Sequence, residues 1–131
     1  MPIVETERHG QIFVVRMNRP DRLNALSHEM RTLLAEAWTE FRHSNELEVA
    51  IFTGTGRGFC AGEDMQESLK NGAPGGRRPD IEDPFMSGTL EKPVIAAIAG
   101  VRAGICMMPV PTCSFVVFAS IQVAGVTASV P

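Results

Sequence analysis

The most constraining stretch of this sequence is a glycine-rich turn that directly follows a run of apolar residues. "VAIFTG", residues 49–54, is followed by "TGRGFCAGED", residues 55–64. A short apolar run bounded by turn residues predicts a buried strand, and the glycines predict that another group approaches the backbone closely. A short helix is expected directly afterwards, over Asp64–Lys70. A strand, a glycine turn and a helix in this order present backbone N–H groups to negative charge.

Three kinds of chemistry use such a turn. A phosphate-binding loop of the Walker type needs a Lys followed by Ser or Thr, whereas the chain reads Gly-Glu-Asp at 62–64, so this reading fails. A dinucleotide fingerprint is formally present as Gly56, Gly58 and Ala61, and it remains an alternative. A short helix and the Gly- and Pro-rich segment 71–84 stand where that fold needs a long helix. The third chemistry is stabilisation of an oxyanion by two N–H groups, which small residues favour because they leave room for the acyl group.

The rest of residues 1–101 predicts an α/β protein. Residues 3–8 and 11–17 alternate as a β-hairpin does, with His9-Gly10 as its turn. Ser27 has the position of an N-cap for an amphipathic helix that ends near Ser44. Its expected apolar face, most simply part of the core, consists of Met30, Leu33, Leu34, Ala37, Trp38 and Phe41. "KPVIAAIAG", residues 92–100, predicts a second buried strand, while residues 71–84 predict an irregular surface loop.

Composition excludes several classes of protein. A net charge of −3, with 21% charged and 44% hydrophobic residues, is that of an ordinary globular protein and argues against nucleic acid as a partner. Three cysteines without a short paired spacing do not form a metal motif, so we expect no metal site. Together with an N-terminus that has no apolar leader, they favour a reducing, cytoplasmic location.

The charges are unevenly distributed. Every Asp, Glu, Lys and Arg lies in positions 1–102, and residues 103–131 contain none. This tail shows neither helical periodicity nor alternation, so its pattern predicts no regular element. Residues 112–130 are long enough to be considered as a membrane span, but their Ser, Thr and Gln residues make a poor one. We therefore divide the chain into residues 1–101 and an atypical tail, residues 102–131.

Three segments together resemble the crotonase (enoyl-CoA hydratase/isomerase) family. They are "VAIFTG" with the glycine turn, "MNRPDRLNALSHEM" upstream of it and "EKPVIAAIAG" downstream. The resemblance covers about residues 3–101 and implies the family's ββα spiral, here truncated to its N-terminal half. It also implies an acyl-CoA thioester as the substrate, with coenzyme A as part of that substrate and no separate cofactor. Family members are commonly homotrimers or hexamers.

The resemblance also implies site residues. Ala61 corresponds to the first oxyanion-hole donor of the family, and Ile105 takes the position of the second donor, where the family has a glycine run. The substrate-binding residues implied are Arg22, Leu23, Asn24, Ala25, Leu26, Gly62, Glu63, Asp64 and Met65. From the sequence alone, Arg22 is equally compatible with a solvated loop residue, and Asp64 with a plain first-turn acid.

The tail departs from the family's catalytic pattern. Hydratases of this family carry one carboxylate shortly after the glycine run and another about twenty residues later, but the first position is Met108 here and no acid follows. The implied activity, hydration of a 2-enoyl-CoA, therefore lacks its acid/base pair in this chain. Isomerisation and thioester hydrolysis share the features that remain. The alternative is a non-catalytic acyl-CoA-binding remnant or an interaction module.

A change of reading frame would account for the tail. Met107-Met108 must be encoded by ATGATG, which places a stop codon in one alternative frame and Asp-Ala in the other. In that second frame the neighbouring codons permit Ala-Gly-Gly and Asp-Leu at the family's spacing. We hypothesise a one-base insertion or deletion near codons 101–102, which the nucleotide sequence across codons 95–115 tests.

Overall fold

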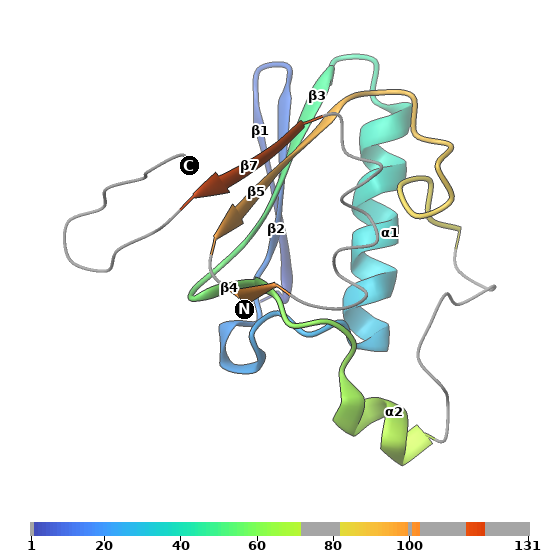
Figure 1. Ribbon diagram of the computed structural model, residues 1–131. Coiled ribbons are helices and arrows are strands. Elements are labelled where there is room, and N and C mark those ends of the chain that lie inside the picture. The colour runs from blue at the N-terminus through green and yellow to red at the C-terminus, as the bar shows by residue number, and fades with distance from the viewer. Residues whose placement is uncertain (1, 72–81, 100, 103–114, 120–131) are drawn as a thin grey trace.

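A five-stranded sheet forms the centre of the protein (Figure 1). The computed structural model describes residues 2–71, 82–99, 101–102 and 115–119. The strand order is β1-β2-β3-β5-β7, with β1 antiparallel to β2 and all the other neighbours parallel. The strands are β1 (Val4–His9), β2 (Ile12–Met17), β3 (Val49–Gly54), β5 (Val94–Ala99) and β7 (Phe115–Ala119). The predicted α/β class is therefore confirmed.

The N-terminal hairpin and the first helix form as their patterns predict. His9 pairs with Ile12, and Gly10 takes the left-handed conformation that this tight turn requires (φ 61°). The helix α1 (His28–His43) begins at Ser27, whose Oγ accepts the Met30 N–H at 3.1 Å. The predicted strands and helix are thus confirmed within a residue or two at each end.

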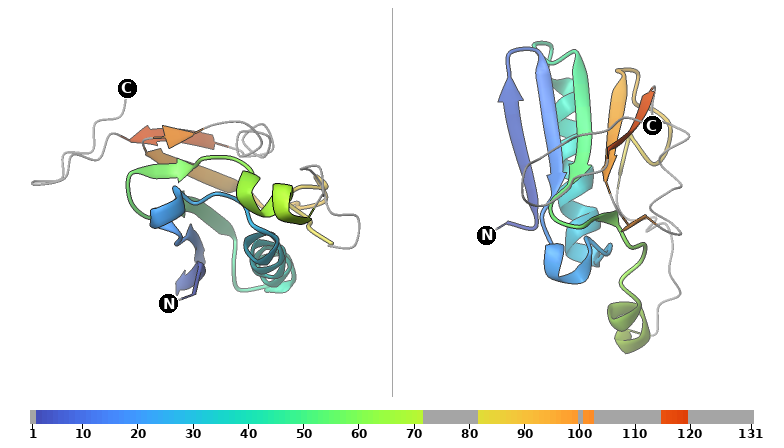
Figure 2. Two further views of the ribbon diagram at one scale, coloured as in Figure 1. Left: turned by 90° about the horizontal axis from the view of Figure 1, so that it is seen from below. Right: turned by 60° about the vertical axis from the view of Figure 1, so that its left-hand side comes forward.

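The core lies between α1 and one face of the sheet (Figures 1 and 2). Trp38 is its centre, with ring centroids 5.2 Å from Phe52 and 4.7 Å from Phe85. Phe85 belongs to residues 82–90, which also pack Leu90 against the core. Lys92 ties the start of the next strand to the end of α1, because its Nζ donates to the carbonyl oxygens of Phe41 and Ser44 at 2.7 and 2.5 Å.

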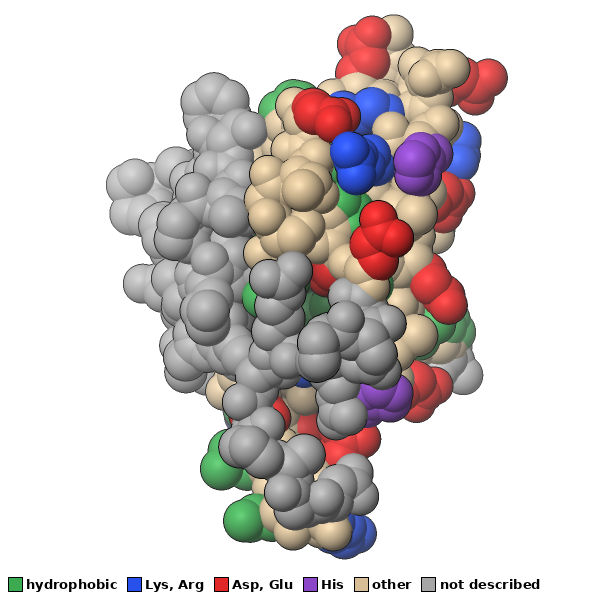
Figure 3. Space-filling model, turned by 90° about the vertical axis from the view of Figure 1, so that its right-hand side faces the viewer, with side chains coloured by type: hydrophobic (Ala, Val, Ile, Leu, Met, Phe, Trp, Pro, Cys, Tyr) green, Lys and Arg blue, Asp and Glu red, His purple; other side chains and the backbone are tan. Residues whose placement is uncertain are grey.

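Two short elements surround the glycine turn. The strand β4 (Gly58–Cys60) pairs in parallel with β6 (Val101–Arg102), apart from the main sheet. The helix α2 (Met65–Asn71) follows and projects from the lower end of the molecule (Figure 1). Figure 3 shows hydrophobic side chains standing out at this end, where α2 carries Met65 and Leu69, 61% and 77% exposed.

The uncharged tail contributes β7, which its sequence pattern does not predict. Phe115 to Ala119 pair in register with Ile95 to Ala99 of β5. Its sequence, "FVVFA", is a continuous apolar run and not an alternating one, so periodicity gives no signal for it. Residues 72–81 of the predicted irregular loop lie outside the described residues, as do 103–114 and 120–131 of the tail.

Candidate functional site

Two segments far apart in the sequence lie side by side at the glycine turn. The Ala61 N–H donates to the Leu23 carbonyl at 2.9 Å, the Leu26 N–H donates to the Gly62 carbonyl at 2.8 Å, and the Asp64 N–H donates to the Leu26 carbonyl at 3.0 Å. These bonds join residues 23–26 to residues 61–64 like two short parallel strands, and we call this arrangement the backbone row. It brings together eight of the residues that the resemblance implied, with Arg22 directly before the first segment and Met65 directly after the second.

The chain bends at the start of the first segment of the row, because two consecutive residues adopt the left-handed conformation there. Leu23 and Asn24 have φ values of 51° and 56°, after a turn of 3-10 helix at Pro20–Arg22. Asn tolerates this conformation better than other non-glycine residues do. A bend of this kind reverses the chain, so that residues 23–26 run alongside the glycine turn.

The Asn24 side chain points into the protein and holds the bend in place. It is 0% exposed. Its Nδ2 donates to the carbonyl oxygens of Thr55 and Gly58 at 3.0 and 2.8 Å, and its Oδ1 accepts the Arg19 N–H at 2.7 Å. Because the 0% exposure covers the whole residue, no atom of Asn24 is open to a substrate in this structure, and its side chain, with three internal partners, fixes the bend of the loop.

A largely buried ion pair crosses the row. Arg19 Nη1 lies 2.8 Å from Asp64 Oδ2, and the two side chains are 21% and 7% exposed. Burial raises the pKa of the Asp64 carboxyl, but the Arg19 hydrogen bond, the Glu67 N–H and the charges of Arg19 and Arg22 outweigh it and hold this pKa below its usual value.

The Asp64 carboxylate is expected to make the stability of the fold depend on pH. Because its pKa is lower in the folded state, the stabilisation is fully present above the unfolded pKa near 4 and is lost as the pH falls through the folded value. Between pH 7 and pH 2, the free energy of unfolding of the wild type should fall more steeply than that of Asp64→Asn. Urea titrations at a series of pH values measure both slopes, and parallel curves would contradict the prediction.

The N–H groups of the turn differ in availability. Ala61, the predicted oxyanion donor, has its N–H engaged by the Leu23 carbonyl, so a ligand could use it only after that bond breaks. Gly62 and Glu63 share a trans peptide group, in which the C=O and the N–H point in opposite directions. The Gly62 carbonyl points to Leu26, so the Glu63 N–H points away from the row, and no described residue accepts it.

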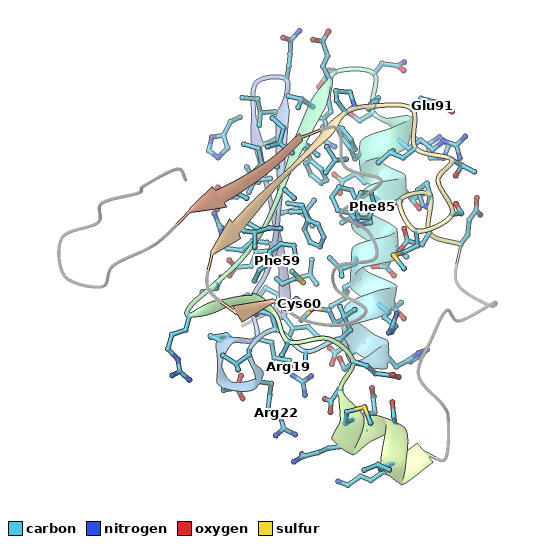
Figure 4. The ribbon with its side chains drawn as sticks, in the orientation of Figure 1. Arg19, Arg22, Phe59, Cys60, Phe85 and Glu91 are labelled. Atoms are coloured by element: carbon cyan, nitrogen blue, oxygen red, sulfur yellow. The ribbon has the colours of Figure 1, made fainter. Side chains whose placement is uncertain are left out.

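A cavity of about 400 Å³ opens beside the row. It is lined by Ile3, Arg19, Arg22, Ser27, Glu29, Asp64, Gln66, Glu67 and Lys70. Arg22 is exposed and donates a hydrogen bond to Gln66 of α2, and Figure 4 shows Arg19 and Arg22 near the base of that helix. The cavity thus contains two of the residues implied to bind substrate.

The remaining predicted positions are partly open or not described. Leu23 and Ala25 are half-buried, Leu26 is in the core, and Met65 is exposed at the start of α2. Ile105 lies outside the described residues. Sequence reasoning missed Arg19 as a partner of Asp64, because no local pattern links two residues 45 positions apart.

The described residues contain no group of three or more His, Cys, Asp or Glu side chains placed to hold a metal ion. Within the same ranges, no helix is both long enough and apolar enough to cross a membrane.

Comparison with known proteins assigns the family. The model of the Enoyl-CoA hydratase/isomerase family matches residues 7–129. The chain belongs to this family. It is similar to 1,2-epoxyphenylacetyl-CoA isomerase of Escherichia coli (strain K12), with 36% identity over 102 residues, which cover 71% of this chain and 38% of that protein. It is also similar to Enoyl-CoA hydratase EchA19 of Mycobacterium tuberculosis (strain ATCC 25618 / H37Rv), with 37% identity over 108 residues, which cover 76% and 40%.

A solved structure of this family has the same fold. An enoyl-CoA hydratase/isomerase from Mycobacterium paratuberculosis superposes with a TM-score of 0.75 and 31% identity, over 95% of this chain and 55% of that one. This member of the family therefore has the crotonase α/β fold, and it spans about half the length of that solved structure and about two fifths of the length of the curated relatives. The family match reaches residue 129, further along the tail than the motifs in residues 3–101.

Proposed function

We propose that this chain binds acyl-CoA thioesters at the backbone row, and that the whole protein to which this fold belongs acts on 2-enoyl-CoA through an oxyanion hole. The observation that carries the proposal is the direction of the Glu63 N–H. The Leu26 N–H fixes its peptide group by donating to the Gly62 carbonyl, so the Glu63 N–H points away from the row and donates to no described residue. The family acts on acyl-CoA substrates, which carry the carbonyl oxygen that such a donor suits.

The first oxyanion donor is assigned to the Glu63 N–H instead of the Ala61 N–H. Hydration of an enoyl thioester places negative charge on the thioester oxygen, and a fixed N–H about 3 Å away stabilises that charge. The Ala61 N–H already donates to the Leu23 carbonyl, whereas the Glu63 N–H can donate to a ligand oxygen without breaking a hydrogen bond to any described residue. The second donor remains assigned to the backbone of Ile105, as the resemblance implies.

The CoA moiety is assigned to the surface around the row and the cavity of about 400 Å³, whose volume suits a ligand of nucleotide size. The Arg22 guanidinium stands at the rim, where it can meet a phosphate. Half-buried Leu23 and Ala25 offer methyl contacts, and exposed Met65 offers a further apolar side chain. Asp64 is already paired with Arg19, so its contribution is structural and it does not contact CoA.

A non-catalytic acyl-CoA-binding role is the second candidate. It is favoured by one observation, the absence of any Asp or Glu from residues 103–131, where the family's hydratases carry their acid and base. Binding of the thioester needs only the row, whereas addition of water needs a base to take its proton. Both candidate functions therefore predict binding of acyl-CoA, and only the enzymatic one predicts hydration of an enoyl-CoA.

We expect the chain to bind CoA thioesters saturably. We also expect that it does not hydrate crotonyl-CoA faster than the uncatalysed background reaction. Calorimetric titration measures the first property and loss of the enoyl absorbance measures the second. Arg22→Gln should weaken CoA binding about tenfold, since it removes a charge-assisted contact to phosphate. Arg57→Gln, which removes an exposed arginine from the β3–β4 turn, is the matched control and should not weaken it.

Measurable hydration would reject the non-catalytic role, and absence of CoA binding would reject both candidates.

A further inference from the structure

Arg19 stands at the head of a continuous hydrogen-bonded chain that ends at the Glu63 N–H. We infer that Arg19 is a positioning residue that aligns and polarises this N–H through two peptide groups, and that Asp64 holds Arg19 in place for this task. The inference rests on the proposed function, in which the Glu63 N–H donates to the carbonyl oxygen of a thioester.

The first link of the chain is the contact between Arg19 and the peptide group of Ala25 and Leu26. Arg19 Nη1 donates to the Ala25 carbonyl oxygen at 3.2 Å. The other end of this peptide group is the Leu26 N–H. A positive charge on the carbonyl side draws electron density from the amide, so the Leu26 N–H becomes a stronger donor.

The second link is the next peptide group along the row. The Leu26 N–H donates to the Gly62 carbonyl at 2.8 Å, and the same peptide group carries the Glu63 N–H at its opposite end. Both peptide bonds are trans, so each group passes the polarisation in one direction. The charge of Arg19 therefore acts on the Glu63 N–H through these two peptide groups.

Asp64 fixes the arginine and the turn at the same time. Its Oδ2 accepts Arg19 Nη1 at 2.8 Å, and its Oδ1 accepts the Glu67 N–H at 3.2 Å. Its own N–H is held by the Leu26 carbonyl at 3.0 Å. Because the side chain and the backbone of Asp64 are both tied down, Glu63, the residue just before it, has little freedom to turn its N–H away.

The test uses a chromophoric thioester, 4-dimethylaminocinnamoyl-CoA, whose absorbance moves to longer wavelength when its carbonyl oxygen accepts hydrogen bonds. The whole chain is saturated with this probe and the displacement of the absorbance maximum is recorded, while the Kd for free CoA is measured separately. The displacement of the absorbance maximum reports the strength of the hydrogen bond to the thioester carbonyl, and the Kd for CoA reports binding by the rest of the site.

Arg19→Met should reduce the displacement by at least half in protein that is saturated with the probe, whatever Kd this variant has for CoA. Arg19→Lys should restore most of the displacement, since an ammonium group can donate to the same two oxygens. Arg42→Met is the matched control, because it breaks the Arg42–Glu91 ion pair of 3.1 Å away from the row and should leave the displacement unchanged.

An unchanged displacement in folded, saturated Arg19→Met would overturn the inference and leave Arg19 a purely structural residue. If Arg19→Met does not fold, the isosteric Asp64→Asn decides, because it releases the arginine and should also lower the displacement; no change there overturns the inference. A wild type that binds neither CoA nor the probe would reject the proposed function itself, and the inference with it.

Discussion

Replacement of Asn24 by alanine is expected to lower the free energy of unfolding by about 4 kcal/mol. The substitution leaves the buried Gly58 carbonyl, the partly buried Thr55 carbonyl and the partly buried Arg19 N–H without the Asn24 side chain as a partner. It also places alanine at φ 56°, where an L-residue other than Asn, Asp or Gly is strained. Urea denaturation followed by Trp38 fluorescence measures the loss.

Asn18→Ala is the matched control for this experiment. Asn18 is a half-buried asparagine whose Nδ2 donates to the Pro2 carbonyl and to Glu5, both at 3.2 Å, near the edge of the sheet. We expect a loss of about 1 kcal/mol or less there, because water can replace those bonds. Equal effects of the two substitutions would contradict the buried role that we assign to Asn24.

Gly54→Ala is expected to cost about 3 kcal/mol and to weaken CoA binding as well. A Cβ at this position would lie 2.5 Å from the Phe59 carbonyl oxygen, 2.8 Å from Asn24 Nδ2 and 3.1 Å from the Gly58 carbonyl oxygen. Two of these atoms belong to the backbone of β4, so β4 must move away from β3. That movement carries the glycine turn with it and disturbs the backbone row.

Gly10→Ala separates crowding from conformational strain. Gly10 has φ 61°, but a Cβ built there meets nothing within 4 Å. We expect about 1 kcal/mol from strain alone and no change in CoA binding. If Gly54→Ala lowered the free energy of unfolding no more than Gly10→Ala does, the prediction that crowding between β3 and β4 destabilises the variant would be wrong.

Local patterns in the sequence determined the elements that carry most of the core. The N-cap at Ser27 and the apolar face of α1 predict this helix correctly, because capping and periodicity act within a few turns of one element. The same holds for the hairpin and for the strand before the glycine turn. The sequence also predicts that the turn is a site, since several glycines in so short a stretch destabilise the chain unless another group must approach its backbone closely.

The tertiary structure alone decided which atoms of that site are available. Whether the free N–H belongs to Ala61 or to Glu63 depends on which carbonyl lies opposite each peptide group, and no side chain encodes this. The pairing of Arg19 with Asp64 joins positions 45 residues apart and has no local signature. β7 was hidden for a related reason, because a parallel strand takes its place from the strand beside it. Short-range chemistry thus determined the elements and predicted where the candidate site lies. The directions of backbone groups brought together from distant segments decided which N–H groups of that candidate site are available.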